Sequence, residues 1–263
     1  GTLSFNTIAN VSGGASSLGA PTTVVNGTIA LGAGTLLYTG SGNSSDRVIN
    51  LTGAGTVDAS GTGALILSGG VTGNTQNLTL TGTGSGTESG VINTTTGTLT
   101  KNGTGTWTLS NVANTYTGQT TINAGTVSVA KMANGGVNSS LGATAAATPI
   151  LLGSATAATL SYTGGTDSSD RQITINGAGG GTIQATAAGT LTLTGALNNS
   201  GNLVTFDTNT GNITESGVIS GAAVEPGADP PGLVVAEIES PKHTESSLTR
   251  RTPSMPPTRS FTA

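Results

Sequence analysis

The sequence of 263 residues contains no cysteine, a single histidine and few aromatic residues. Without cysteine the chain has neither a disulfide framework nor a thiol nucleophile, and with His243 alone it has no zinc cluster and no Ser-His relay within its repeats. No calcium-binding loop of the Asp-x-Asp-x-Asp-Gly type is present. We therefore predict no catalytic residue, no cofactor and no metal site.

Charge is scarce as well. Eight basic residues stand against twelve acidic ones, for a net charge of −4. A nucleic-acid partner is excluded, because neutralising phosphates needs clustered lysine and arginine. Apolar runs such as Ile150–Leu152 last a few residues, against about twenty for a membrane-spanning helix. The chain begins at Gly1 without a methionine or a signal segment, so we interpret it as a piece of a longer protein or a processed product.

Glycine, threonine, serine and asparagine dominate, and they recur in a long internal repeat. The offset between the two copies is about 124 residues. It relates several short motifs, in the same order in both copies: Gly1–Ser4 to Gly125–Ser128, Ser17–Ala20 to Ser140–Ala143, Tyr38–Gly40 to Tyr162–Gly164, Ser44–Arg47 to Ser168–Arg171, and Glu88–Ile92 to Glu215–Ile219. The sequence thus predicts one complete unit, residues 1–124, and most of a second, residues 125–220.

Within each unit, short stretches alternate apolar and hydroxyl residues, for example Leu78–Leu80 and Leu191–Leu193. Alternation at period two, with glycine and Asn-Gly at the corners, indicates β-strands, and no window shows helical periodicity. We predict an all-β chain in which residues 1–220 form a parallel β-helix (solenoid) of ten or eleven coils, roughly 50 Å long. An antiparallel immunoglobulin-type sandwich is the alternative, although such domains usually have a core tryptophan and only one unit contains one.

Residues 97–111 and 114–127, which include Leu99–Lys101, Thr106–Leu109 and Asn114–Gly118, closely resemble the autotransporter-associated β-strand repeat. That repeat occurs in the passenger regions of bacterial autotransporters and related exported proteins. The resemblance implies a right-handed β-helix, export to the bacterial cell surface or the extracellular space, and a structural or adhesive role.

The pairs Asp46–Arg47 and Asp170–Arg171 are the most prominent charges. One interpretation is a polysaccharide site, or an acid-plus-arginine catalytic site as in β-helix enzymes that cleave pectin. The other is a structural corner, in which the aspartate accepts backbone N–H groups and the arginine caps carbonyls of neighbouring coils. We favour the corner, because a catalytic site seldom appears twice in the same register.

We also assign structural and not functional roles to the remaining acidic and aromatic residues that stand out in the sequence. Glu88 and Glu215 repeat in the same way as the Asp-Arg pairs, and Asp58 is interpreted as a solvated carboxylate without a partner. Trp107 and Tyr116 could stack on sugar rings, but we expect them to cover a strand and a corner.

Two functional hypotheses follow from these features. The first is a non-enzymatic, exported surface protein, a stalk or adhesin-like passenger region, whose polar faces contact glycans, matrix or like molecules and whose open ends favour end-to-end self-association. The second is a β-helix carbohydrate-active enzyme, a polysaccharide lyase or hydrolase. Such an enzyme should carry a unique acidic cluster, whereas the charges found here are repeated.

Residues 221–263 differ abruptly, because they hold seven of the nine prolines. They predict a proline-rich, disordered tail. A second hypothesis is an out-of-frame tail: read one base earlier from about residue 237, Ser247–Ser254 permits Leu-Ser-Asn-Ala-Ala-Asn-Thr-Phe, similar to Leu109–Tyr116.

Overall fold

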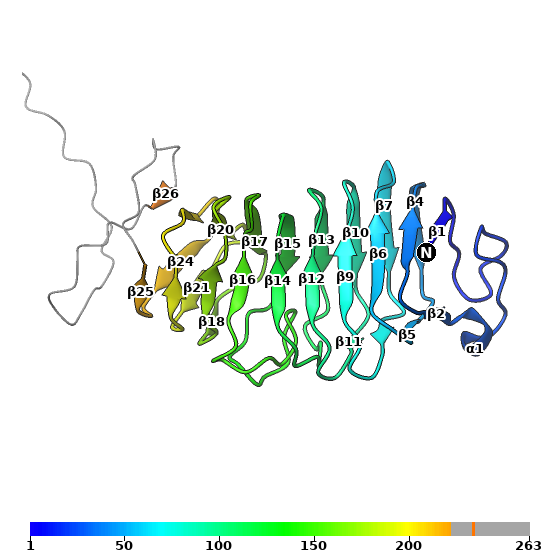
Figure 1. Ribbon diagram of the computed structural model, residues 1–263, viewed down its shortest axis with the longest axis horizontal. Coiled ribbons are helices and arrows are strands. Elements are labelled where there is room, and N and C mark those ends of the chain that lie inside the picture. Colours follow the sequence, from blue (N-terminus) through cyan, green and yellow to red (C-terminus); the bar gives the residue numbers. More distant parts are fainter. Residues whose placement is uncertain (222–232, 235–263) are drawn as a thin grey trace, which may run out of the picture.

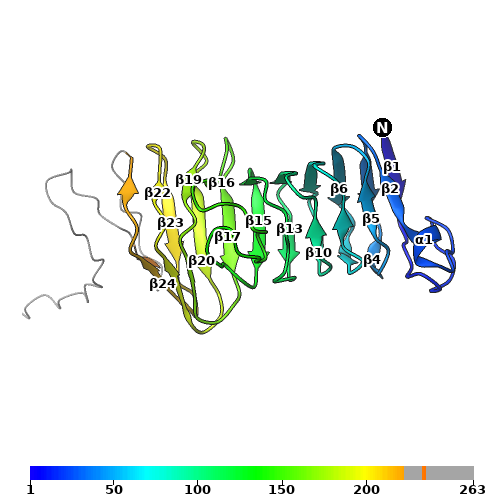
Figure 2. The same ribbon diagram turned by 90° about the horizontal axis from the view of Figure 1, so that it is seen from below.

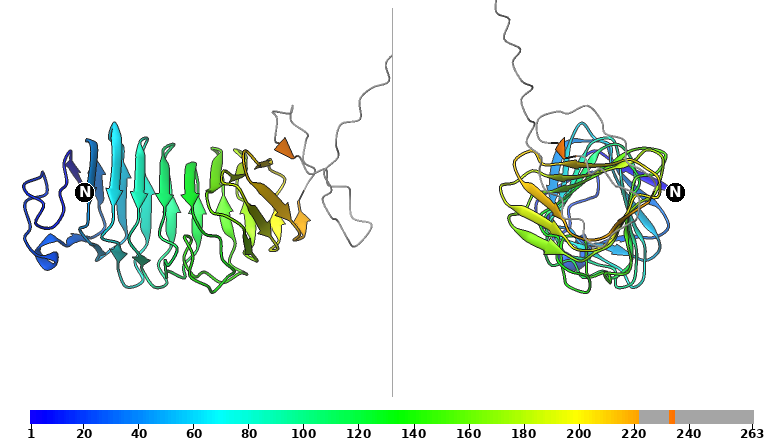
Figure 3. Two further views of the ribbon diagram at one scale, coloured as in Figure 1. Left: turned by 180° about the vertical axis from the view of Figure 1, so that it is seen from behind. Right: turned by 90° about the vertical axis from the view of Figure 1, so that its left-hand side faces the viewer.

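The computed structural model describes residues 1–221 and 233–234, and residues 1–221 form a parallel β-solenoid (Figure 1). Most coils contribute a strand to each of three faces, and within every sheet the successive coils of residues 1–221 pair in parallel. Seen along the long axis, the coils superpose around a common centre (Figure 3). The predicted all-β parallel β-helix is confirmed.

The two main faces are a ten-stranded and a nine-stranded sheet, seen from a second side in Figure 2. The first contains β1 (Thr2–Phe5), β3 (Thr35–Tyr38), β6 (Gly55–Ala59), β9 (Leu78–Thr81), β12 (Leu99–Lys101), β14 (Thr120–Ile122), β16 (Ile150–Leu152), β19 (Ile173–Ile175), β22 (Leu197–Asn198) and β25 (Ile219–Ser220). The second contains β4 (Ser41–Ser45), β7 (Gly63–Leu67), β10 (Ser85–Glu88), β13 (Thr106–Leu109), β15 (Gly125–Val129), β17 (Ala158–Tyr162), β20 (Gly181–Ala185), β23 (Val204–Asp207) and β26 (Leu233–Val234).

The third face carries two shorter sheets. One consists of β2 (Ile29–Leu31), β5 (Ile49–Leu51), β8 (Val71–Thr72) and β11 (Ile92–Asn93), and the other of β18 (Asp167–Ser169), β21 (Thr190–Leu193) and β24 (Asn212–Glu215). A single helical turn, α1 (Val24–Gly27), interrupts the strands. The sequence did not indicate this turn; it is capped by the Thr23 side chain, which accepts a hydrogen bond from the Asn26 amide.

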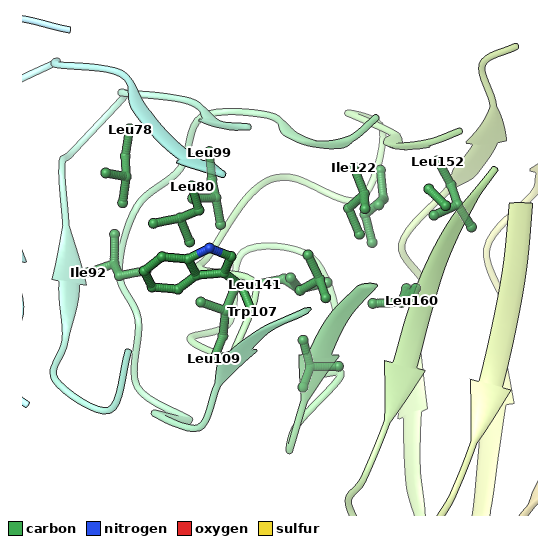
Figure 4. Close-up of a cluster of buried hydrophobic side chains, with 14 of the residues drawn as sticks. Leu78, Leu80, Ile92, Leu99, Trp107, Leu109, Ile122, Leu141, Leu152 and Leu160 are labelled. Atoms are coloured by element: carbon green, nitrogen blue, oxygen red, sulfur yellow. The ribbon is translucent and has the colours of Figure 1, made fainter. Parts of the chain in front are cut away.

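The core lies inside the coils, where alternate residues of most strands in residues 1–221 point inward. Figure 4 shows Trp107 among Leu80, Ile92, Leu99 and Leu109. In the sheet register Trp107 pairs with Gly86 of the preceding coil, and a Cβ built on Gly86 would lie 2.5 Å from the indole ring. The large ring therefore fits because the coil beneath it has no side chain at that point.

Two coils are longer than the others. Most coils advance by 21 to 24 residues, as between Thr35 and Thr56. Ser4, however, pairs with Leu37, and Thr121 pairs with Leu151 thirty residues later. Each long coil contains an insert: residues 7–28, the first insert, and residues 131–149, the second insert. These inserts explain why ten strands, and so nine turns, occupy the length for which ten or eleven coils were expected.

The two sequence units are rotated relative to each other. The strand β15 begins the second unit as β1 begins the first, but β1 lies in the ten-stranded sheet and β15 in the nine-stranded one. Likewise β16, the equivalent of β2, lies in the ten-stranded sheet, whereas β2 lies on the third face. One unit of about 124 residues therefore makes five complete turns of the solenoid and then continues to the next face. As a result, equivalent residues of the two units lie on different sides of the solenoid.

The strand β26 departs from the parallel arrangement, because it pairs antiparallel with β23 at the end of the nine-stranded sheet. Leu233 and Val234 of this strand belong to the segment predicted as a proline-rich tail. The rest of the tail from residue 222 onward, with both hypotheses about it, lies outside the described residues. In the part of the chain that the structure describes, no helix is long and apolar enough to cross a membrane.

Candidate functional site: the Asp-Arg corners and the buried charges

The two aspartates of the Asp-Arg pairs each accept a hydrogen bond from a backbone amide near the start of an insert. One carboxylate oxygen of Asp46 accepts a hydrogen bond of 2.7 Å from the Val11 amide. The carboxylate of Asp170 accepts one of the same length from the Gly135 amide. In each case the aspartate is an acceptor for backbone N–H of an insert about 35 residues earlier.

The two arginines contact carbonyl groups of the same inserts. Arg47 donates through Nε to the Gly27 carbonyl, at 2.6 Å, and through Nη1 to the Leu18 carbonyl, at 2.7 Å. Its equivalent, Arg171, donates through Nη1 to the Leu141 carbonyl at 3.1 Å. Arg171 also reaches four other acceptors of the second insert: Ala133 O, Val137 O, Ser139 Oγ and Gly142 O.

Both guanidinium groups are buried, and burial lowers the pKa of Arg47 and of Arg171. Within residues 1–221, no acidic side chain forms a salt bridge with either guanidinium group. Carbonyl oxygens provide the compensation instead. Because Asp46 is exposed while Arg47 is buried, acid and base of this pair do not converge on a common space.

The aromatic candidates lie in the core. Trp107 and Tyr116 are both 0% exposed, so neither ring can stack on a sugar in this structure. The indole N–H of Trp107 donates to the Thr81 carbonyl at 2.9 Å, and the hydroxyl groups of Tyr116 and Thr120 lie 2.9 Å apart. Each polar atom thus has a partner inside the solenoid.

Two glutamates are buried at the ends of strands. Glu88 accepts a hydrogen bond of 2.8 Å from the Gly90 amide, and Glu215 accepts one of 2.7 Å from the Gly217 amide. Burial raises the pKa of Glu88 to about 8 and that of Glu215 to about 7, although the backbone donors oppose the shift. Glu88 is therefore largely protonated at neutral pH, as expected for a carboxyl group without a cation beside it.

Asp58 departs from the expectation of a solvated carboxylate without a partner. It is half-buried on the ten-stranded sheet, and the Ser60 hydroxyl donates to it at 2.5 Å. Its neighbours in register are Leu37 and Thr81, so no second acid lies opposite it.

Lys101 was not singled out by sequence reasoning, although it is 1% exposed. Its ammonium group donates to the carbonyls of Asn102, Gly103 and Ala124 at 2.7, 2.8 and 3.0 Å. Burial lowers the pKa of Lys101 to about 8, while three carbonyl acceptors match the three donors of the charged form. The signal was present in the alternation: in Leu99–Lys101 the lysine has the parity of the inward leucine.

A shallow hollow at the first coils is lined by glycine, alanine and threonine, namely Gly1, Thr2, Ala33, Gly34, Thr35, Ala54 and Thr56. It contains no acidic or imidazole side chain. Among the described residues, no three histidine, aspartate or glutamate side chains are grouped so that they could hold a metal ion. The acids of the solenoid are dispersed, and most of their contacts are with the backbone.

One segment of the chain matches a known family of repeats. Residues 99–129 match the family model described as passenger-associated-transport-repeat. These residues span β12 to β15 and contain Lys101, Trp107 and Tyr116. The match confirms the resemblance drawn from the sequence. No curated protein matches the chain, and no solved structure matches it.

Proposed function

We propose that this chain is the non-enzymatic passenger region of an exported bacterial surface protein, in which the solenoid serves as a rigid stalk with adhesive faces. The observation that carries the proposal is the passenger-type repeat at residues 99–129, embedded in an unbroken stack of coils. A stack with a continuous core holds its two ends at a fixed distance, which is what a stalk requires.

The distribution of charge supports a non-enzymatic role. Five of the eleven charged residues among residues 1–221 are buried: Arg47, Glu88, Lys101, Arg171 and Glu215. Their hydrogen bonds are almost entirely to backbone groups, and the one exception described is the contact of Arg171 with the Ser139 hydroxyl. A polysaccharide-cleaving enzyme needs its acid and base exposed together in one groove.

Ladders of hydroxyl groups form the outer surface of the two main sheets. On the ten-stranded sheet five half-buried threonines follow one another in register: Thr35, Thr56, Thr79, Thr100 and Thr121. The nine-stranded sheet carries a second ladder in register: Thr106, Thr126, Thr159, Thr182 and Thr205. Strands in such a sheet are about 4.8 Å apart, so each ladder repeats one weak contact many times. We infer that glycans, matrix or like molecules are bound through these faces.

Binding to immobilised glycans, matrix proteins and the chain itself tests the proposal. One variant carries Thr79→Asp and Thr100→Asp, and its matched control carries Thr126→Asp and Thr159→Asp on the other face. We expect the two variants to lose a similar amount of stability, because aspartates opposite each other on neighbouring strands repel, and at least one of the variants to lose binding as well. Cleavage of pectin, alginate or a related polymer that disappears in Asp46→Asn or Asp170→Asn would overturn the proposal in favour of an enzyme.

A further inference from the structure

The two inserts have the same internal turn. Ser16 donates through its hydroxyl to the Gly19 carbonyl at 2.9 Å, and Ser139 donates to the Gly142 carbonyl at the same distance. In both inserts the amide of the intervening leucine also donates back to this serine. The two inserts therefore share this turn, and they differ after it, because the helical turn α1 occurs in the first insert and not in the second.

The second insert is covered by the preceding coil. The side-chain amide of Asn114 donates to the Ser140 carbonyl at 2.9 Å, and the Ala143 amide donates to the Tyr116 carbonyl at 2.7 Å. Asn114 and Ser140 are each 0% exposed as a result. The covering residues belong to the segment that matches the passenger-type repeat.

The equivalent surface of the first insert is uncovered among the described residues. Ser17 and Ala20, which correspond to Ser140 and Ala143, are exposed. Within residues 1–221 neither the Ser17 carbonyl nor the Ala20 amide has a hydrogen-bond partner. Leu18, the equivalent of the fully buried Leu141, is only half-buried.

The same segment also completes a sheet in the second unit. After covering the insert, it forms β14, which pairs with β16 through Thr121 and Leu151. The strand β16 thus lies between β14 and β19. Its equivalent in the first unit, β2, is the end strand of its sheet and, among the described residues, pairs with β5 and with no other strand. In the second unit one segment, residues 114–122, both covers the insert and pairs with β16. In the first unit no described segment does either for the first insert and β2.

We propose that the first insert and the free edge of β2 form a docking surface for a passenger-type repeat segment, of the kind that residues 114–124 represent, joined to Gly1. In the second unit, Ala124 leads directly into Gly125, and Gly125 is the equivalent of Gly1. A second copy of the chain does not offer this segment, because its β14 is already paired on both sides, with β12 and β16.

The chemistry of the occupant follows from the covered insert. An asparagine side chain donates to the Ser17 carbonyl, a tyrosine carbonyl accepts from the Ala20 amide, and a Thr-Thr-Ile strand pairs with β2. One contact has no equivalent: Thr144 donates to the Gly118 carbonyl, but the first insert has Pro21 at that point. The inference does not rest on the stalk function, because it concerns only which segment fits this surface.

An extended chain tests the proposal. A copy of residues 97–124 is fused ahead of Gly1, which reproduces the junction between Ala124 and Gly125, and amide hydrogen exchange is measured in the full chain. We expect exchange at the Ala20 amide and along β2 to slow by at least about tenfold, since new hydrogen bonds must open before exchange. The Ala143 amide, already covered in the second unit, is the internal reference.

Two matched extensions complete the experiment. One has the same composition in scrambled order, and the other carries Asn114→Ala in the copied segment only. We expect no protection of Ala20 with the scrambled extension and reduced protection with the alanine variant. If Ala20 exchanges at one rate in all the chains while Ala143 stays protected, the surface does not bind this segment and the proposal fails, whether or not the extension folds.

Discussion

Arg171 donates a hydrogen bond to the carbonyl of Leu141, thirty residues earlier, just as Arg47 donates to the carbonyl of Leu18. The same arginine-to-carbonyl hydrogen bond thus occurs in both units, on two different sides of the solenoid. It explains why a long coil can carry an insert without losing register with its neighbours: the insert leaves the stack, and a buried arginine in the next coil holds it against the stack.

Replacing Arg171 by alanine is expected to destabilise the protein more than replacing Arg47. Arg171 contacts five acceptors and Arg47 two, and each variant leaves carbonyls without a donor. A loss of roughly 1 to 3 kcal/mol is expected for each, with Arg171→Ala at the upper end. Urea denaturation measures it, with Lys131→Ala as the control. Lost glycan or cell binding with unchanged stability would show instead that the arginines bind ligand.

Glu88 is expected to make stability depend on pH. Its pKa is raised to about 8 from 4.5, so between these values the unfolded chain releases a proton that the folded chain keeps. The folded state therefore loses stability as the pH rises through this window, and the loss is complete above about pH 8.

Melting temperatures of Glu88→Gln and the unmodified chain at pH 5, 7 and 9 test this expectation. The advantage of the glutamine variant should grow with pH. Glu215→Gln serves as comparison, because the pKa of Glu215 is raised only to about 7 and its window closes earlier. Parallel pH curves for Glu88→Gln and the unmodified chain would contradict the burial argument.

Lys101→Met is expected to destabilise the solenoid although methionine is apolar and of similar length. The substitution leaves the carbonyls of Asn102, Gly103 and Ala124 without their common donor. A buried acceptor without a partner costs about 1–3 kcal/mol. Thermal unfolding measures the loss, and Thr100→Val, on the outer side of the same strand, is the control. If Lys101→Met is more stable than the unmodified chain, the desolvation of the ammonium group costs more free energy than its three hydrogen bonds contribute.

Trp107→Ala is expected to cost about 3–5 kcal/mol, because it opens a cavity above Gly86 and removes the donor to the Thr81 carbonyl. The double variant Trp107→Ala with Gly86→Ala tests the packing directly. In the unmodified chain a Cβ at Gly86 collides with the indole, but in the alanine variant that space is free. The second substitution should then cost less than Gly86→Ala does alone, as denaturation of the four chains would reveal. Equal costs would contradict this packing.

The sequence alone determined the strands, the repeat and the corners. Alternation in segments such as Leu99–Lys101 specifies which side chains face inward, because successive residues of a strand point to opposite faces. The repeat at an offset of about 124 residues marked Asp46 and Asp170 as equivalent, and the contacts of these two residues are indeed the same in kind.

The tertiary structure decided the phase of the repeat and the partners of the buried charges. Counting residues cannot show that one unit takes five turns and one face, because the inserts lengthen two coils without adding strands to the stack. Nor could it show that Lys101 caps carbonyls, since those of Asn102 and Gly103 lie beside it in sequence but that of Ala124 comes from the next coil. Both features depend on which segments lie side by side in space, and that is settled only when the coils stack.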